Sequence, residues 1–241
     1  MSTIARTSQP ETTSPGRDSP PGERYVVKAA TWDLYDCLSE ATGEYRGLRF
    51  AFDGEDLEIM TVGPLHDWLT ETFRAFITIL AAGLDLEYFA LGQTTWRRPE
   101  VRRGIQADLC FYFDYDKIAT ARAAIARKSN DVADYPNPDF AVEIDLSEPK
   151  VDRSGIYEAL KVPEVWKYRD GVVTVEHLGA DGKYFAADKS LHLWLTVAEI
   201  NHWITSENPA SSVTWGQRLE AWVVDVLNPR AYDLDDGEDT A

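Results

Sequence analysis

Hydrophobic and polar residues alternate along residues 140–146, a pattern that predicts a β-strand. Because successive side chains of a strand point to opposite faces, Val142 and Ile144 share one face, and Glu143 and Asp145 share the other. The surrounding run is apolar, so we expect both carboxylates to be buried or half-buried in the fold.

A second alternating stretch, residues 105–113, predicts another strand, with Asp108 on the face opposite its large apolar side chains. An unpaired carboxylate is costly to bury. Magnesium would remove this cost, since it accepts one or two carboxylates and leaves positions for water and phosphate oxygens. The two strands therefore predict a metal pocket shared by Asp108, Glu143 and Asp145. The alternative is a structural group satisfied by arginine or backbone donors.

The rest of the chain alternates between helical and strand periods. Residues 48–52 and 57–60 flank an Asp-Gly turn and predict a β-hairpin, while apolar residues at spacings of three and four predict a helix from Pro64 to Gly83. Further helices are expected near 31–42, 119–128, 152–160, 196–204 and 215–227, and further strands near 86–90, 94–97, 165–168, 172–177 and 183–187. This order predicts an α/β fold with a mixed β-sheet flanked by helices.

Composition indicates the limits of the domain and the cellular compartment. We expect one domain over residues 25–228 between two disordered tails, residues 1–24 and the acidic residues 229–241. No run of 18 uncharged apolar residues exists, so no membrane span is expected. The first residues lack the apolar core of a secretory signal, and Cys37 and Cys110 form no CxxC motif. We therefore expect a cytoplasmic protein with both cysteines buried and reduced.

The formal charge of −17 disfavours simple nucleic-acid binding, because that requires cations facing phosphates. Any phosphate contact must then come from a local basic patch. The only dense cluster consists of Arg97, Arg98, Arg102 and Arg103. The alternative is a solvated loop with ordinary surface arginines.

Several motifs together resemble the Uma-type family of restriction endonucleases. The acidic run 139–145 continues into residues 152–166, which end in Val-Pro-Glu-Val-Trp. Further matching pieces are Asp53-Gly54 with residues 57–60, His66, residues 91–95 and residues 103–108. The resemblance spans about residues 45–205, and the combination of motifs is more specific than any one of them.

The resemblance implies the restriction-endonuclease-like fold of the PD-(D/E)XK nucleases, with Asp108 and Glu143 as the two acidic residues of the motif. It also implies a Mg²⁺ or Mn²⁺ cofactor and DNA as the partner. Two positions depart from the pattern: Ala107 replaces the usual proline, and Asp145 replaces the usual lysine. Relatives often supply a lysine from the following helix, where this chain has Arg153. The general base therefore stays open.

Four further residues are candidates for the site. Glu58 could add a metal-facing carboxylate, and His66 could contact phosphate or orient a water; the alternatives are a strand-surface glutamate and a capping or packing histidine. Arg153 could stabilise transition-state charge but cannot act as a base, and the alternative is an ion pair with a neighbouring acid. We expect Arg153, fixed at a helix start, to matter more than the mobile Lys150, with little effect on folding when it is removed.

The favoured hypothesis is a Mg²⁺-dependent DNA endonuclease. The alternatives are a degenerate nuclease fold that binds without cleaving and a metal-dependent phosphodiesterase acting on a small nucleotide. A homodimer is expected only by analogy with nucleases that pair subunits to cut both strands. Because clustered carboxylates repel one another, at least one should have a raised pKa without metal.

Overall fold

The computed structural model describes residues 22–42, 47–207 and 212–230. Most of the two expected tails lies outside these residues. At the described ends, Arg24 begins the first strand, and Arg230 forms an ion pair with Glu199 at 2.9 Å. The folded part therefore extends slightly beyond the expected boundaries at both ends.

The strands form two sheets. A five-stranded antiparallel sheet has the spatial order β1 (Arg24–Val27), β3 (Leu57–Thr61), β2 (Leu48–Phe52), β6 (Arg103–Gln106) and β5 (Thr95–Arg98). A six-stranded sheet has the order β11 (Tyr184–Ala187), β10 (Val172–Leu178), β9 (Glu164–Arg169), β8 (Phe140–Asp145), β7 (Leu109–Tyr112) and β4 (Phe89–Ala90). The second sheet is mixed because β8 and β9 are parallel. The α/β class and the mixed sheet are confirmed, with a second sheet added.

The expectation of one continuous strand over residues 105–113 is wrong. The chain leaves the five-stranded sheet after β6 and enters the six-stranded sheet at β7, so Ala107 and Asp108 form the crossing between them. Both crossing residues are buried, and the alternation of apolar side chains continues through them without a turn residue. Asp108 therefore lies at the junction of the sheets rather than on a strand face.

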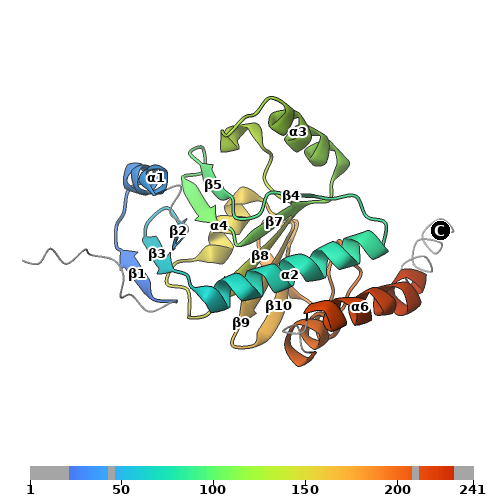
Figure 1. The fold of residues 1–241 in the computed structure, drawn as a ribbon. Helices are drawn as coiled ribbons and strands as arrows, with labels where there is room; N and C mark the ends of the chain where they lie inside the picture. Colours follow the sequence, from blue (N-terminus) through green and yellow to red (C-terminus); the bar gives the residue numbers. More distant parts are fainter. Residues whose placement is uncertain (1–21, 43–46, 208–211, 231–241) are drawn as a thin grey trace, which may run out of the picture.

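The helices follow the predicted pattern: α1 (Trp32–Ala41), α2 (Pro64–Gly83), α3 (Tyr115–Ala126), α4 (Arg153–Leu160), α5 (Val197–Asn201) and α6 (Ser212–Trp222). Thr31 caps α1, and Thr196 with Glu199 forms the expected capping box of α5. The β2–β3 hairpin turns through Asp53 to Asp56, where Gly54 has a φ of +94° that favours glycine. The long α2 lies across the molecule beside α6 (Figure 1).

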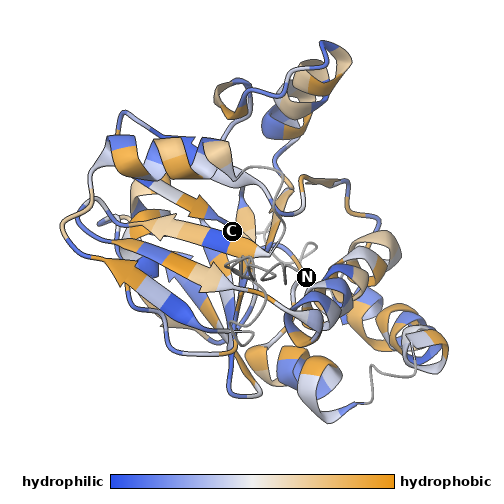
Figure 2. Cartoon of the chain, turned by 60° about the vertical axis from the view of Figure 1, so that its left-hand side comes forward, coloured by the Kyte–Doolittle hydropathy of each residue, from blue (hydrophilic) through white to orange (hydrophobic). Residues whose placement is uncertain are grey.

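The core has two main parts, one on each face of the six-stranded sheet. Phe140, Val142 and Ile144 of β8 pack with α2 and α6, whereas Ala141 packs with residues of α3 and α4. All six residues of β8 are buried. Figure 2 shows apolar and hydrophilic positions alternating along the strands. A carboxylate on β8 is therefore enclosed by the fold from both sides, as the sequence predicted.

Two features bear on the expectations about a membrane span and about the cysteines. Within residues 22–42, 47–207 and 212–230, none of the helices has the length and apolar character needed to cross a membrane. Cys110 is buried, but Cys37 is exposed on α1, so the expectation that both cysteines are buried is wrong for Cys37. It lies on the solvent side of a short amphipathic helix whose inner face is carried by Tyr35.

Candidate active site

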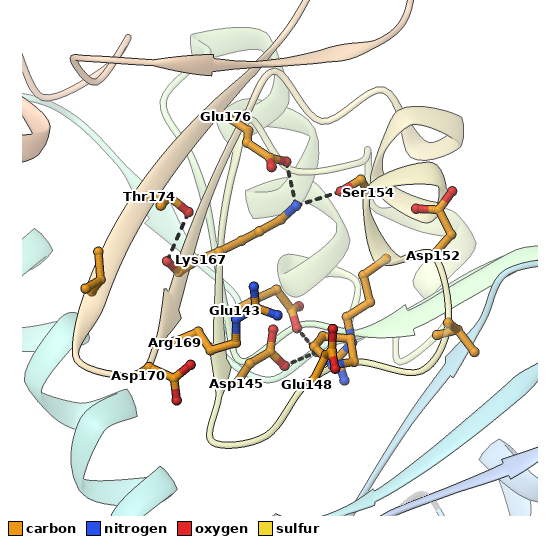
Figure 3. Close-up of a pocket in the computed structure, with 14 residues that line it drawn as sticks. Glu143, Asp145, Glu148, Asp152, Ser154, Lys167, Arg169, Asp170, Thr174 and Glu176 are labelled. Carbon is orange, nitrogen blue, oxygen red and sulfur yellow. Dashed lines mark hydrogen bonds and ion pairs between the residues drawn. The ribbon is translucent and has the colours of Figure 1, made fainter.

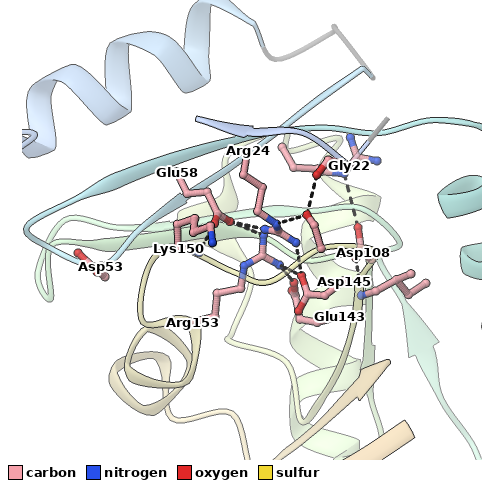
Figure 4. Close-up of polar contacts among 12 residues, drawn as sticks. Gly22, Arg24, Asp53, Glu58, Asp108, Glu143, Asp145, Lys150 and Arg153 are labelled. Carbon is pink, nitrogen blue, oxygen red and sulfur yellow. Dashed lines mark hydrogen bonds and ion pairs between the residues drawn. The ribbon is translucent and has the colours of Figure 1, made fainter. Parts of the chain in front are cut away.

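Three acidic side chains meet around one guanidinium at the carboxyl end of β8. The Nη1 atom of Arg153 contacts Glu143 and lies 3.2 Å from Asp145, and its Nη2 atom donates to Glu58 at 2.8 Å. Figure 4 shows Arg153 among these carboxylates. Arg153 is the first residue of α4, which is capped by Asp152, so helix packing fixes its backbone. We call Glu58, Glu143 and Asp145 the carboxylate cluster.

A second arginine, Arg24 of β1, pairs with two members of the cluster. It donates from Nη1 to Glu58 and from Nη2 to Asp145, each at 2.5 Å. The pairing of β1 with β3 brings it there, since Val26 lies opposite Glu58 and Arg24 opposite Met60. The expected tail boundary at residue 24 therefore excluded a residue that contacts two members of the cluster.

Burial and repulsion leave Glu143 incompletely compensated. Burial is the largest cause that raises the pKa of Glu143, the charges of Asp108 and Asp145 add to it, and Arg153 only partly opposes them, so the pKa is about 8. Tyr157 of α4 also donates its hydroxyl proton to Glu143. Burial would raise the pKa of Glu58 as well, but Arg153 and Arg24 hold it below its ordinary value. Glu143 therefore has the raised pKa that clustered carboxylates predict.

Asp108 lies beside the cluster with partners of its own. Its Oδ2 atom accepts a hydrogen bond from the amide of Ile144 at 2.8 Å, and its Oδ1 atom lies 3.0 Å from Nε2 of His66 and 3.7 Å from Nε of Arg49. Burial alone would raise the pKa of Asp108, but His66 and the Ile144 amide hold it below its ordinary value. The same contact raises the pKa of His66 against the effect of its burial.

A pocket of about 540 Å³ opens in front of the cluster (Figure 3). Glu143, Asp145 and Arg153 line it, and β9 contributes Lys167 and Arg169. Asp108, Glu58 and His66 do not line it and are almost completely buried. The structure thus brings the predicted site residues into one contiguous group, of which only part faces the pocket.

The described residues contain no ready-made metal site with three Asp, Glu, His or Cys side chains. Instead, the guanidinium groups of Arg24 and Arg153 lie among the carboxylates. The donor set still fits a divalent cation on two grounds. Among the described residues, the buried Oδ1 atom of Asp108 has no donor in hydrogen-bonding geometry, although Nε2 of His66 lies 3.0 Å away, and the raised pKa of Glu143 shows that its ionised form lacks a sufficient counter-charge, which a cation would supply.

Lys150 and Arg153 have different positions relative to the cluster. The backbone N–H of Lys150 donates to Glu58 at 2.5 Å, while its ammonium group lies at the surface, 3.9 Å from Glu148. Arg153 is 7% exposed. The ion pair with neighbouring acids, which the sequence left as the alternative for Arg153, is present. These contacts change the expectation for folding, because removal of Arg153 would leave three buried carboxylates short of a counter-ion.

Two members of the arginine cluster on the β5–β6 hairpin are held by structural contacts. Arg97 pairs with Asp36 at 3.0 Å and Glu40 at 3.2 Å, and Arg98 is buried, where it donates to the carbonyl oxygens of Val132 and Tyr135. Two of the four arginines are therefore occupied by structural contacts, so a phosphate patch on this hairpin would depend on Arg102 and Arg103.

Sequence reasoning missed Arg24, Arg49, Tyr157 and Lys167. Arg24 stands next to a Ser- and Pro-rich segment, which hid its membership of a strand. Tyr157 was recognisable only as one helical turn beyond Arg153, and its hydroxyl contact with Glu143 depends on the packing of α4. Lys167 lies within the predicted strand 165–168, but nothing in the sequence placed that strand beside β8.

Comparisons with known proteins agree with this architecture. The family model Uma2, described as "Putative restriction endonuclease", matches residues 32–197. A search among curated proteins gave no match. The two sheets with flanking helices are consistent with the restriction-endonuclease-like fold that the sequence resemblance implied. Because the family model matches well over half of the chain, the protein belongs to the Uma2 family.

Proposed function

We propose that the protein is a divalent-metal-dependent endonuclease that hydrolyses phosphodiester bonds of DNA. The observation that carries the proposal is the incompletely compensated Glu143, which lines an open pocket next to Asp145 and adjoins Asp108 through the Ile144 amide. A buried, electron-rich oxygen site of this kind suits a hard cation such as Mg²⁺ or Mn²⁺. Membership of a family described as restriction endonucleases supports the same chemistry.

Asp108 and Glu143 would hold the ion, with Asp145 within reach of the same position. When bound, such an ion polarises a phosphate oxygen and lowers the pKa of a coordinated water. The protein's own groups prepare the carboxylates: His66 and the Ile144 amide keep Asp108 ionised, and Tyr157 orients Glu143. Glu58 fixes the two arginines from behind, and we assign it this role rather than direct contact with substrate.

A second function has specific support. Arg24 and Arg153 already bind the carboxylates that a metal would use, and no lysine follows Glu143 at the usual position. This arrangement favours a degenerate nuclease fold that binds nucleic acid without cleaving it. A phosphodiesterase for small nucleotides has no observation of its own in its favour, and pairing of two copies stays a prediction from the resemblance.

A cleavage assay separates these functions. Supercoiled plasmid and single-stranded DNA are incubated with the protein in Mg²⁺, Mn²⁺ or EDTA, beside Asp108→Asn and the control Asp139→Asn. Asp139 is similarly buried, 4% exposed against 1% for Asp108, but its partners are Lys117 and the amides of Phe113 and Asp114, at the opposite end of β8 from the cluster. We expect nicking that requires metal and is lost only in Asp108→Asn. Activity in EDTA, or full activity of Asp108→Asn, would contradict the proposal. No cleavage and no calorimetric signal for Mg²⁺ would establish the degenerate function.

A further inference from the structure

Two cations in the pocket play no part in holding the carboxylate cluster. They are Lys167 and Arg169 of β9, and in the parallel pairing with β8 they lie directly beside Glu143 and Asp145 respectively. Paired residues of neighbouring strands project from the same face of a sheet. The pocket floor therefore carries an acidic row on β8 and a basic row on β9, side by side (Figure 3).

Arg153 is poorly suited to meet an anion arriving in the pocket. Its guanidinium group already contacts three carboxylates, and it is almost completely buried. Turning it toward a phosphate would leave those carboxylates uncompensated inside the protein, which is strongly unfavourable. The positively charged group that binds an incoming phosphate must therefore belong to another residue.

Lys167 and Arg169 are available for that contact. The ammonium group of Lys167 donates to Ser154 at 2.6 Å and to Glu176 at 2.5 Å, in an ion pair whose side chains are 21% and 25% exposed. Such partly exposed pairs contribute little to stability, so exchange of Glu176 for a phosphate has a small cost. Arg169 is exposed, and within the described part of the chain its side chain has no ion pair or hydrogen bond.

We propose that Lys167 and Arg169 form the phosphate-binding row of the pocket and hold the DNA backbone against the catalytic carboxylates. The inference rests on the proposed function and names its substrate contacts. Arg169 offers a planar pair of donors that suits phosphate oxygens, and Lys167 offers a compact charge beside Glu143. Acids outnumber bases in the pocket lining and would repel an anion. Lys167 and Arg169 are therefore the lining residues beside which a phosphate can bind.

The test measures binding separately from cleavage. Fluorescence anisotropy follows a labelled oligonucleotide, single-stranded or duplex, with Ca²⁺ in place of Mg²⁺ over a range of salt concentrations. The double variant Lys167→Gln/Arg169→Gln is compared with Arg127→Gln/Lys128→Gln at the end of α3, which removes the same charge outside the pocket. Arg169→Gln alone provides a variant at an exposed position in case the double variant folds poorly.

We expect the pocket variant to bind at least about tenfold more weakly, since hydrogen bonds to charged groups are the strong ones. Its salt slope, d log K/d log[salt], should fall by about two, because each lost phosphate contact removes about one released counterion. The α3 variant should keep the slope of the wild-type protein. Single-turnover cleavage by the pocket variant should need more enzyme for half-maximal rate.

The outcomes distinguish the two proposals. If the pocket variant and the α3 variant bind with equal affinity and slope while the wild-type protein cleaves DNA, the phosphate-binding row is refuted and the nuclease function stands. If the wild-type protein neither binds nor cleaves either form of DNA, the nuclease function fails, and the inference that rests on it fails with it.

Discussion

The two ends of β8 show two ways to bury a carboxylate. Asp139, just before the strand, accepts hydrogen bonds from the amides of Phe113 and Asp114 and an ion pair from Lys117 at 2.5 Å. Within the described part of the chain, Glu143, near the other end, has no backbone amide partner and shares Arg153 with other acids. Amide donors satisfy Asp139 with the chain's own groups and fasten the start of α3. The shared arginine leaves the ionised form of Glu143 poorly compensated, beside a pocket.

The largest expected effect is on the free energy of unfolding, when the counter-ion at either end of β8 is removed. Arg153→Ala should lower the free energy of unfolding by about 3–5 kcal/mol, because it leaves buried carboxylates without this counter-ion. Lys117→Ala should cost no more than about 1 kcal/mol, since Asp139 keeps its two amide donors and Lys117 is partly exposed. Urea denaturation at pH 7 measures both values. Equal losses for the two variants would remove the distinction between the two ends.

The next effect concerns activity. Glu143→Gln keeps the shape of the side chain but cannot ionise to bind a cation, so plasmid nicking under single-turnover conditions should fall by about 10²–10³-fold, the range for one lost electrostatic contact. Asp139→Asn should nick plasmid close to the wild-type rate after correction for the folded fraction. A comparable loss in both variants would assign Glu143 a structural role like that of Asp139.

Metal binding should depend on the end of β8 that carries Glu143 and not on the end that carries Asp139. Mg²⁺ that binds the folded protein at a hundred times its Kd should stabilise it by about 2.7 kcal/mol through mass action. Differential scanning fluorimetry should record a higher Tm for the wild-type protein and Asp139→Asn, and a smaller shift for Glu143→Gln. An unchanged Tm of the wild-type protein at saturating Mg²⁺ would support the degenerate function instead.

The smallest effect is a pH dependence in EDTA. The pKa of Glu143 is about 8 in the folded protein against an ordinary 4.5, so between these values the folded state binds more protons than the unfolded state. Its contribution to the free energy of unfolding must then decline as pH rises, by at most about 1.4 kcal/mol per pH unit. Urea denaturation at pH 5.5, 6.5 and 7.5 should show this decline relative to Glu143→Gln. Parallel profiles would contradict the raised pKa.

Local patterns were enough to predict the helices, the hairpin and β8. The spacing of apolar residues in α2 and the capping box of α5 are short-range signals, and both elements occur where the sequence placed them. The grouping of Glu143 with Asp145 follows from strand alternation alone. That Asp108 adjoins them was predicted from the polar faces of the two strands and supported by the family resemblance, and the structure explains it through the Ile144 amide.

The remaining features depend on contacts distant in the sequence. Alternation continues through Ala107 and Asp108, so nothing local marks the change of sheet there. Arg24 reaches Asp145 across 121 positions because β1 adds to the edge of the five-stranded sheet. The neighbours of Lys167 in space are set by the register of β8 with β9, which the order of residues does not specify. Site residues of these kinds require the fold before they can be recognised.

The position of β1 at the sheet edge has a practical consequence for choosing fragments of this protein. A fragment limited to residues 32–197, the part that matches the family model, would keep every acidic residue of the candidate active site. It would lose Arg24, which binds Glu58 and Asp145, and it would also lose Trp215 and Leu219, which pack against α2. An inactive or insoluble fragment of that length would therefore reveal the cost of trimming, rather than anything about the chemistry of the whole chain.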